Sequence, residues 1–285
     1  MRDLFAQIGG AGLGLRRPLM DELASFTPGD PIDFFEIAPE NWLHLGGRLG
    51  AKLRPFSEAY PIICHGLSLS IGGIGPLNIP LLQDIKQFIA RHNIRHYSEH
   101  LSYTGDESQL YELFPLPLTQ EAVQHTAARI RQAQDILGQR IAIENATYYT
   151  LPAQEMSEVE FINAVVAEAD CHLLLDVNNL YVNSQNHHYC PQQFLQQLNG
   201  AAISYLHIAG HWCEEDNWRI DTHAEAVDEP VWQLLSEVYQ RFGVKPTLLE
   251  RDDNFPSIQT LSREVQRIKQ LQNPALGINT LRSAP

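Results

Sequence analysis

The chain has 285 residues, of which 44% are hydrophobic and 19% charged, and this composition excludes a disordered chain. The formal net charge of −14 disfavours nucleic acid or an anionic membrane as a partner. No apolar run approaches the roughly 18 residues of a membrane-spanning helix. The N-terminal stretch also lacks the apolar core of a signal peptide, so we expect a cytoplasmic protein.

The four cysteines are Cys64, Cys171, Cys190 and Cys213, and no two of them form a C-x-x-C pair. This scatter argues against a zinc site built from thiolates and against a disulfide scaffold. Cys64 and Cys171 lie inside apolar runs, which favours a place in the core.

Short apolar runs recur along the chain at a spacing of about 30 residues. They lack polar alternation, which is typical of strands buried on both faces in a parallel sheet. The predicted strands are residues 7–15, 32–37, 61–65, 94–100, 140–144, 171–176, 203–208 and 246–250.

Helix-like segments with clear start and stop signals separate these runs. A segment over 119–137 closes on Gly138, Ser157 begins a capping box, and Asp228 precedes a helix with Pro230 in its first turn. Two further amphipathic segments cover 79–92 and 257–271.

Eight strands alternating with helices predict a parallel sheet closed into a (β/α)8 TIM barrel, with an open doubly wound sheet as the alternative. We expect a single domain over 1–272 and a loose tail over 273–285. The glycines in 9–14 do not meet the G-x-G-x-x-G register, because Leu15 stands where the third glycine belongs.

Most of the predicted strands end in acid, base or amide groups. The run 171–176 ends in Asp176, and Asn178 follows two residues later, so both side chains point the same way in an extended backbone. In a barrel, the carboxyl ends of the strands meet at one mouth. The strand ends and the loop after the seventh strand supply His65, Glu99, His100, Glu144, Asn145, Asp176, Asn178, His207, Asp221, His223, Glu250 and Arg251.

So many imidazoles and carboxylates at one mouth would repel or titrate unless cations bound them. The donors are nitrogen and oxygen only, which suits iron, manganese or zinc. Their number exceeds what one ion needs. We therefore predict two or three metal ions, with Glu144 well placed to bridge.

Each residue also has a simpler interpretation when it is taken alone. His65 can be a buried histidine with a hydrogen-bond partner, Glu144 with Asn145 can cap a helix, and Asp221 with His223 can belong to a turn. Their joint occurrence at consecutive strand ends favours the metal site. His44 and His211 fall in loops at the expected mouth and stay undecided.

The strand ends carry six short motifs: HGLSLS at 65–70, SEHLS at 98–102, IEN at 143–145, LDVNN at 175–179, LHIAG at 206–210 and LERD at 249–252. In this order they resemble the DUF692 family, also called UPF0276, which comprises the multinuclear non-haem iron-dependent oxidases. The resemblance runs from about Gly12 to about Asn254 and includes Phe35, Glu36 and the segment 39–42. No presumed metal position departs from the pattern.

The resemblance implies a TIM barrel that holds two or three iron ions, in mixed Fe(II)/Fe(III) states, with O2 as co-substrate. The implied ligands are His65, His100 and Glu144 for the first iron, Glu144, Asp176, His207 and Glu250 for the second, and Asn178, Asp221 and His223 for a third, weaker one. The six residues of the first two sites are the expected catalytic residues.

Characterised members of this family oxidise cysteine residues of ribosomally made precursor peptides, usually with a partner protein that presents the peptide. The resemblance therefore implies an iron- and O2-dependent oxidoreductase acting on a cysteine-containing precursor peptide. A substrate thiolate is a soft ligand that could take an open iron position.

A second function stays open. A similar order of ligands occurs in apurinic-site endonucleases and sugar-isomerase-like barrels, which use zinc or manganese. The endonucleases carry a further histidine three residues after the aspartate of the sixth strand, where this chain has Asn179. The acidic charge also opposes DNA binding. A protein that only binds or delivers metal is the third possibility.

Overall fold

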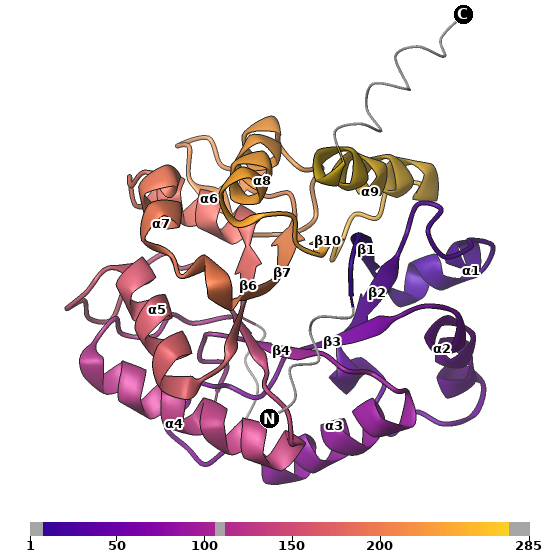
Figure 1. The fold of residues 1–285 in the computed structure, drawn as a ribbon, viewed down its shortest axis with the longest axis horizontal. Coiled ribbons are helices and arrows are strands. Elements are labelled where there is room, and N and C mark those ends of the chain that lie inside the picture. Colours follow the sequence, from indigo (N-terminus) through magenta and orange to yellow (C-terminus); the bar gives the residue numbers. More distant parts are fainter. Residues whose placement is uncertain (1–7, 106–111, 274–285) are drawn as a thin grey trace, which may run out of the picture.

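The computed structural model of the chain describes residues 8–105 and 112–273. Its parallel strands close into one barrel with the helices packed around the outside (Figure 1). Around the barrel the order is β1-β10-β7-β6-β5-β4-β3-β2. The strands are β1 (Ala11–Gly14), β2 (Phe34–Ile37), β3 (Ile62–Gly66), β4 (Tyr97–His100), β5 (Ala142–Glu144), β6 (His172–Asp176), β7 (Ile203–Ile208) and β10 (Thr247–Leu249).

The barrel is closed because β1 pairs in parallel with both β10 and β2. This closure confirms the predicted (β/α)8 barrel and excludes the open doubly wound sheet. Each barrel strand lies within one predicted run, except that β3 extends one residue further, to Gly66. The strands are almost entirely buried, as their uninterrupted apolar sequences predicted.

The helices with the clearest sequence signals form as predicted: α3 (Ile79–Arg91), α4 (Gln120–Leu137), α5 (Glu158–Ala169), α8 (Glu229–Phe242) and α9 (Ile258–Gln272). The side chain of Thr119 caps α4, and Gly138 ends it in the left-handed conformation at φ 78°. Ser157 and Glu160 form both halves of the capping box of α5.

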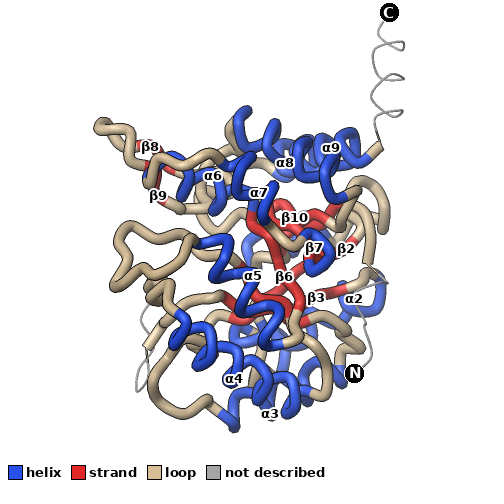
Figure 2. The backbone as a smooth tube through the Cα atoms, turned by 60° about the vertical axis from the view of Figure 1, so that its left-hand side comes forward, coloured by secondary structure: helices blue, strands red, loops and turns tan. Residues whose placement is uncertain are grey.

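Shorter elements complete the described part: α1 (Met20–Leu23), α2 (Gly47–Ala59), α6 (Val177–Asn186), α7 (Pro191–Gln197), a hairpin of β8 (Trp212–Cys213) with β9 (Arg219–Ile220), and the 3-10 helices at Arg17–Leu19, Pro39–Asn41 and Gly200–Ala202. Figure 2 shows this hairpin next to α6, at the periphery of the molecule. No described helix is long and apolar enough to cross a membrane. Of the predicted tail, residues 274–285 lie outside the described residues.

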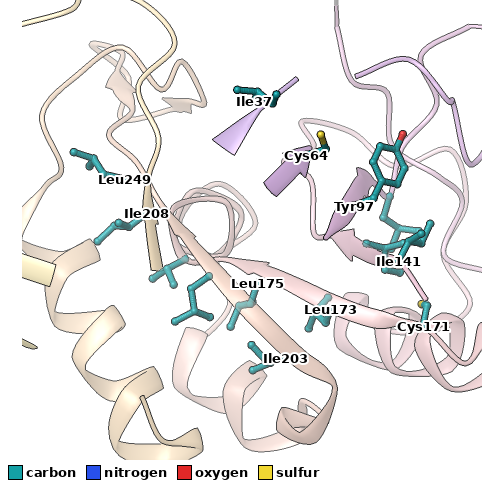
Figure 3. Close-up of a cluster of buried hydrophobic side chains, with 14 of the residues drawn as sticks. Ile37, Cys64, Tyr97, Ile141, Cys171, Leu173, Leu175, Ile203, Ile208 and Leu249 are labelled. Carbon is teal, nitrogen blue, oxygen red and sulfur yellow. The ribbon is translucent and has the colours of Figure 1, made fainter. Parts of the chain in front are cut away.

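The hydrophobic core has two parts. The larger part lies between the strands and the surrounding helices, and Figure 3 shows side chains of this layer, among them Ile37, Cys64, Leu173 and Leu175. The smaller part fills the inside of the barrel, and its members are Phe34, Ile63, Ala142, Leu174, Tyr205 and Leu248.

The alternation of side chains along a strand connects this inner core to the barrel mouth. Residues two apart on a strand point to the same side, so the residue two positions after each inner-core residue also faces inward. Gly12 leaves room for this packing, because a Cβ atom there would come within 2.5 Å of the Phe34 ring. The residues that follow the inner core by two positions are Glu36, His65, Glu144, Asp176, His207 and Glu250.

Candidate metal centre

The predicted ligands come together at the carboxyl ends of the strands, where TIM-barrel proteins carry their active sites. A pocket of about 490 Å³ opens there, and its lining includes His65, His100, Glu144, His223 and Glu250. The ligand atoms fall into three groups that could each hold a metal ion: His65, His100 and Glu144; Glu144, Asp176, His207 and Glu250; and His223, Glu250 and Asp252.

The first group is compact and buried. Oε2 of Glu144 lies 2.9 Å from Nε2 of His65 and 3.4 Å from Nε2 of His100. The two Nε2 atoms are 3.1 Å apart. Nδ1 of His100 faces the carbonyl oxygen of Gly66 at 3.0 Å, which leaves Nε2 for the site.

The second group shares Glu144 with the first. Nδ1 of His207 lies 2.8 Å from Oε2 of Glu250 and 3.5 Å from Oε1 of Glu144. Oδ2 of Asp176 is 3.9 Å from the same nitrogen. Asp176 also caps α6, because its Oδ1 accepts from the backbone N–H of Asn179 at 2.7 Å. The capping role and the ligand role therefore use different oxygens of one carboxylate.

The residues predicted for the third site also meet. Nε2 of His223 is 2.7 Å from Oδ1 of Asp221, and the side-chain amide of Asn178 donates to that oxygen at 2.9 Å. The oxygen of this amide faces Nδ1 of His211 at 2.8 Å. His211 was undecided from the sequence and is a buried neighbour of this group.

Glu250 joins the third group to the second. Its Oε2 lies 3.2 Å from Nδ1 of His223 and 2.8 Å from Nδ1 of His207. Asp252 approaches the same nitrogen of His223 at 3.6 Å. Glu144 and Glu250 thus link the three groups into one continuous set of donors.

Several of these donors are buried and make no hydrogen bond of regular geometry among the described residues, although ion pairs join them to one another. They are Oε2 of Glu144, Oδ2 of Asp176, Nδ1 of His207 and Nε2 of His223. Burying so many ionisable groups together is costly, and a bound cation would offset part of that cost. These atoms face one another and are nitrogen and oxygen, so the residues fit metal ions such as iron, manganese or zinc.

The first group has opposite pKa shifts on its two histidines. Burial opposes charge on His65, but the Glu144 carboxylate outweighs it and raises the pKa of His65 to about 9. Burial and the charge on His65 lower the pKa of His100 to about 4. Without metal, one imidazole therefore carries the positive charge that balances Glu144, and the other stays neutral.

The second and third groups also balance their charges through shifted pKa values. Burial raises the pKa of Asp176 to about 8, with the charge on Glu144 adding to the shift. The pKa of His207 lies well above its usual value despite burial, because of the charges on Glu36 and Glu250. The same ion pairs hold the pKa of Glu250 well below its usual range. In the metal-free centre, protons take the place of cations.

Other polar residues at the mouth hold the ligands without joining them. Asn145 does not cap a helix: its side chain pairs with the backbone N–H and carbonyl of Asp176, at 2.8 and 2.9 Å. Glu99 accepts from the backbone N–H of Leu69 at 3.1 Å and from the hydroxyl of Tyr97 at 2.9 Å, away from the three groups.

Sequence reasoning missed several residues of the centre. Glu36 lies 3.0 Å from Nε2 of His207, Ser98 lies 2.7 Å from Nδ1 of His65, and Arg16 donates to Glu250 at 3.0 Å. Glu36 had a signal, since it stands near the end of the second predicted strand. Arg16 had none, because its partner is 234 residues away in the sequence.

Comparison with known proteins gives one consistent family. The family model described as "RiPP precursor modification enzyme MbnB/TglH/ChrH" matches residues 10–273. A UPF0276 protein of Shewanella sediminis is 53% identical over 262 residues, covering 92% of this chain and 94% of the relative. A UPF0276 protein of Alcanivorax borkumensis is also 53% identical, over 271 residues, covering 92% and 90%.

Solved structures with a similar fold are more distant in sequence. The 3-keto-D-glucoside 4-epimerase YcjR of E. coli superposes with a TM-score of 0.59 at 13% identity, covering 91% of this chain and 98% of that one. Endonuclease IV of Thermus thermophilus gives 0.59 at 16% identity, covering 93% and 98%. At this identity the likeness extends to the TIM-barrel fold alone. The match over almost the whole chain and the close UPF0276 relatives show that this protein belongs to the MbnB/TglH/ChrH family of RiPP precursor modification enzymes.

Proposed function

We propose that this protein is a multinuclear non-haem iron-dependent oxidase that uses O2 to modify cysteine residues of a ribosomally made precursor peptide. The observation that carries the proposal is the place of Glu144. Its two oxygens belong to two adjacent groups of donors at one pocket. A shared carboxylate between two sites of nitrogen and oxygen donors is suited to a pair of redox metals. Membership of the family supports a precursor peptide as the substrate.

The assignment of ligands follows the first two groups of donors and, for the third iron, the residues that the family resemblance implies. His65, His100 and Glu144 would hold the first iron, and Glu144, Asp176, His207 and Glu250 the second. His223 and Asp221 with Asn178 would hold the third, and the contacts of His223 with Glu250 and Asp252 make these two carboxylates competing ligands. Bound iron would supply the electron transfer with O2 and an open position for a soft thiolate.

The chain itself supplies binding, charge balance and shielding. The carboxylates of Asp176, Glu144 and Glu250 are buried, so they hold cations in a medium where water competes weakly. The pocket above them is large enough for a cysteine side chain and its neighbours, and Leu67 and Tyr149 contribute to its walls. These walls would orient the cysteine towards the first two groups and keep bulk water away.

The resemblance to characterised members also supports a partner protein that presents the peptide. We propose such a partner here, because members of the family usually act with one. The gene that encodes the partner and a short cysteine-containing reading frame are expected beside the gene for this chain.

The test uses protein prepared without oxygen and loaded with ferrous iron. We expect two to three irons per chain, oxygen uptake only when the cysteine peptide and its partner are present, and a mass change on the peptide. A peptide with serine in place of cysteine is the control and should stop oxygen uptake, because an alcohol is a poorer iron ligand.

Two results would overturn the proposal. One is stoichiometric zinc with no gain in activity on adding ferrous iron. The other is an unmodified cysteine peptide after incubation with the iron-loaded enzyme, O2, reductant and partner. Cleavage of an abasic DNA strand by the same preparation would favour the hydrolase instead.

A further inference from the structure

Inside the barrel, a chain of hydrogen bonds joins a histidine of the first group to a histidine of the second. Nδ1 of His65 lies 2.7 Å from Oγ of Ser98, and that Oγ lies 2.6 Å from the hydroxyl of Tyr205. The Tyr205 hydroxyl donates to Oε2 of Glu36 at 3.1 Å, and Nε2 of His207 lies 3.0 Å from the same oxygen. All five side chains are buried.

The donor and acceptor of each hydrogen bond in this series follow from the Glu36 carboxylate, which lies between Tyr205 and His207. Oε2 of Glu36 is an acceptor, so the Tyr205 hydroxyl must donate its only hydrogen to it. The Tyr205 oxygen then accepts from Ser98, and the Ser98 oxygen accepts from Nδ1–H of His65. On the other side, Nε2–H of His207 donates to the same Glu36 oxygen.

Two alternatives for the hydrogens are weaker. The Ser98 hydroxyl could donate to the carbonyl oxygen of Cys64, but that distance is 3.4 Å against 2.6 Å to Tyr205. A proton on Glu36 would leave the order unchanged if it sat on Oε1, which has no hydrogen-bond partner among the described residues. Oε2 would still accept from both sides.

We propose that Glu36 is a shared positioning residue of the metal centre, which sets the tautomer of His207 directly and that of His65 through Tyr205 and Ser98. Once a metal ion has displaced the second proton of His65, the hydrogen on Nδ1 leaves the lone pair of Nε2 facing Glu144 and His100. The hydrogen on Nε2 of His207 leaves the lone pair of Nδ1 facing Glu250. One buried carboxylate thus prepares both imidazoles to bind metal.

This arrangement makes an unusual demand on the two histidines. His65 must bind metal through Nε2 and His207 through Nδ1, so the two rings carry their hydrogens on opposite nitrogens. If packing alone oriented the two rings, loss of a hydrogen bond to Glu36 would not change which ring nitrogen carries the hydrogen. The pairing of opposite tautomers with one shared acceptor is therefore the feature to test.

The inference rests on the metal centre of the proposed function but does not need the oxidation. The probe is zinc alone, which is diamagnetic and performs no redox chemistry. Nitrogen-15 NMR of the zinc-loaded protein reports which ring nitrogen carries hydrogen. We expect hydrogen on Nδ1 of His65 and on Nε2 of His207. A protein that shows these tautomers but leaves the peptide unmodified would overturn the oxidase and keep this inference.

Tyr205→Phe removes the hydroxyl that connects Ser98 to Glu36. The Ser98 hydroxyl then keeps only the distant Cys64 carbonyl at 3.4 Å as an acceptor, so it turns more readily towards Nδ1 of His65 and favours the tautomer that cannot bind metal. Zinc affinity of the first site should fall about 10- to 100-fold, as is typical when a hydrogen-bond partner of a metal ligand is lost. The second site should keep its affinity, because the Glu36 contact with His207 is untouched.

Tyr239→Phe is the matched control. Tyr239 is also buried, and its hydroxyl lies 2.5 Å from Oγ1 of Thr247, away from the described ligand histidines on β3, β4 and β7. This variant removes one buried hydroxyl at a comparable cost in stability and should leave zinc affinity and the tautomers unchanged.

Two variants of Glu36 separate the effect of its hydrogen bonds from the effect of its side-chain volume. Glutamine can still accept from both sides through its carbonyl oxygen, so Glu36→Gln should keep both tautomers. Leucine cannot accept, so Glu36→Leu should weaken zinc binding at both sites. Identical tautomers on His65 and His207, or equal effects of Tyr205→Phe and Tyr239→Phe, would overturn the inference. If Glu36→Leu fails to fold, the tyrosine pair and the wild-type spectrum still decide it.

Discussion

Oε2 of Glu144 lies 2.9 Å from Nε2 of His65, and this contact connects β5 to β3 across the intervening strand β4. The other oxygen of Glu144 faces His207 at 3.5 Å. Glu144→Ala should therefore remove metal from the first and the second site together, because one carboxylate serves both. Elemental analysis of protein loaded with ferrous iron measures this loss.

A matched control for that variant is Glu158→Ala. Glu158 is a half-buried glutamate, hydrogen-bonded to Tyr189 at 2.9 Å, and it lines a different pocket. Its replacement should lower stability but leave the metal content normal. Near-normal iron in Glu144→Ala would show that the shared-ligand assignment is wrong.

The third site should be the weakest of the three, because Asn178 offers only a neutral oxygen. Asp221→Ala and His223→Ala should each lose about one metal ion per chain while the other two remain. Asp252→Ala tests the competing assignment, in which Asp252 and Glu250 complete the ligands of His223. If Asp252→Ala also loses one ion and Asp221→Ala does not, the third site uses the carboxylates after β10 in place of Asp221.

The barrel and most of the site could be predicted from the sequence, and the reason is the geometry of strands. Short apolar runs fix the strands, and the period of two places Glu144, Asp176 and Glu250 two positions beyond a residue of the inner core. Parallel strands then bring these ends to one mouth. Neither step requires knowledge of contacts between distant residues.

What the sequence could not supply is the set of residues that hold the ligands. Ser98 and Tyr205 contribute hydroxyl groups that have no pattern of their own, and their contact joins residues 107 positions apart. Arg16 follows the first strand and pairs with residues after the last one, because β1 and β10 are neighbours only once the barrel has closed. Such contacts form only when the barrel closes, so no local pattern in the sequence predicts them.

Metal binding should depend on pH, because protons occupy the metal-free centre. His65 has its pKa raised to about 9 by Glu144, and Asp176 has its pKa raised to about 8 by burial. A metal ion must displace both protons at pH 7, whereas His100, with a pKa near 4, has none to release. Zinc affinity should therefore rise as the pH increases from 6.5 to 9. Calorimetry in buffers of different ionisation enthalpy counts the released protons, and binding without proton release would contradict these protonation states.

The same shift on His65 affects the metal-free fold in the opposite direction. Its folded-state pKa lies above the unfolded value of about 6.5. The charged imidazole beside Glu144 therefore stabilises the fold below pH 6.5, and that contribution is lost as the pH rises through about 9. Urea unfolding of the metal-free protein should show this loss, and zinc-loaded protein should not.

Arg16 places a guanidinium beside two carboxylates of the centre, and its removal provides the last prediction. It donates to Glu250 at 3.0 Å and also pairs with Asp252, and these carboxylates raise its pKa despite burial. Arg16→Met keeps the apolar stem and leaves Glu250 with one less partner. Arg16 is partly exposed and Glu250 is buried, so breaking this pair from one side should lower the free energy of unfolding of the metal-free protein by about 2 kcal/mol, as measured by urea unfolding.

Metal should reduce this cost, because bound cations neutralise the same carboxylates. The difference between wild type and Arg16→Met should therefore shrink when both proteins carry zinc. Arg267→Met is the control: Arg267 pairs with Glu229 at 2.7 Å, but both side chains are well exposed, so its loss should cost less than about 1 kcal/mol with or without zinc. An equal cost of Arg16→Met in the two forms would mean that Arg16 does not share the charge balance of the metal centre.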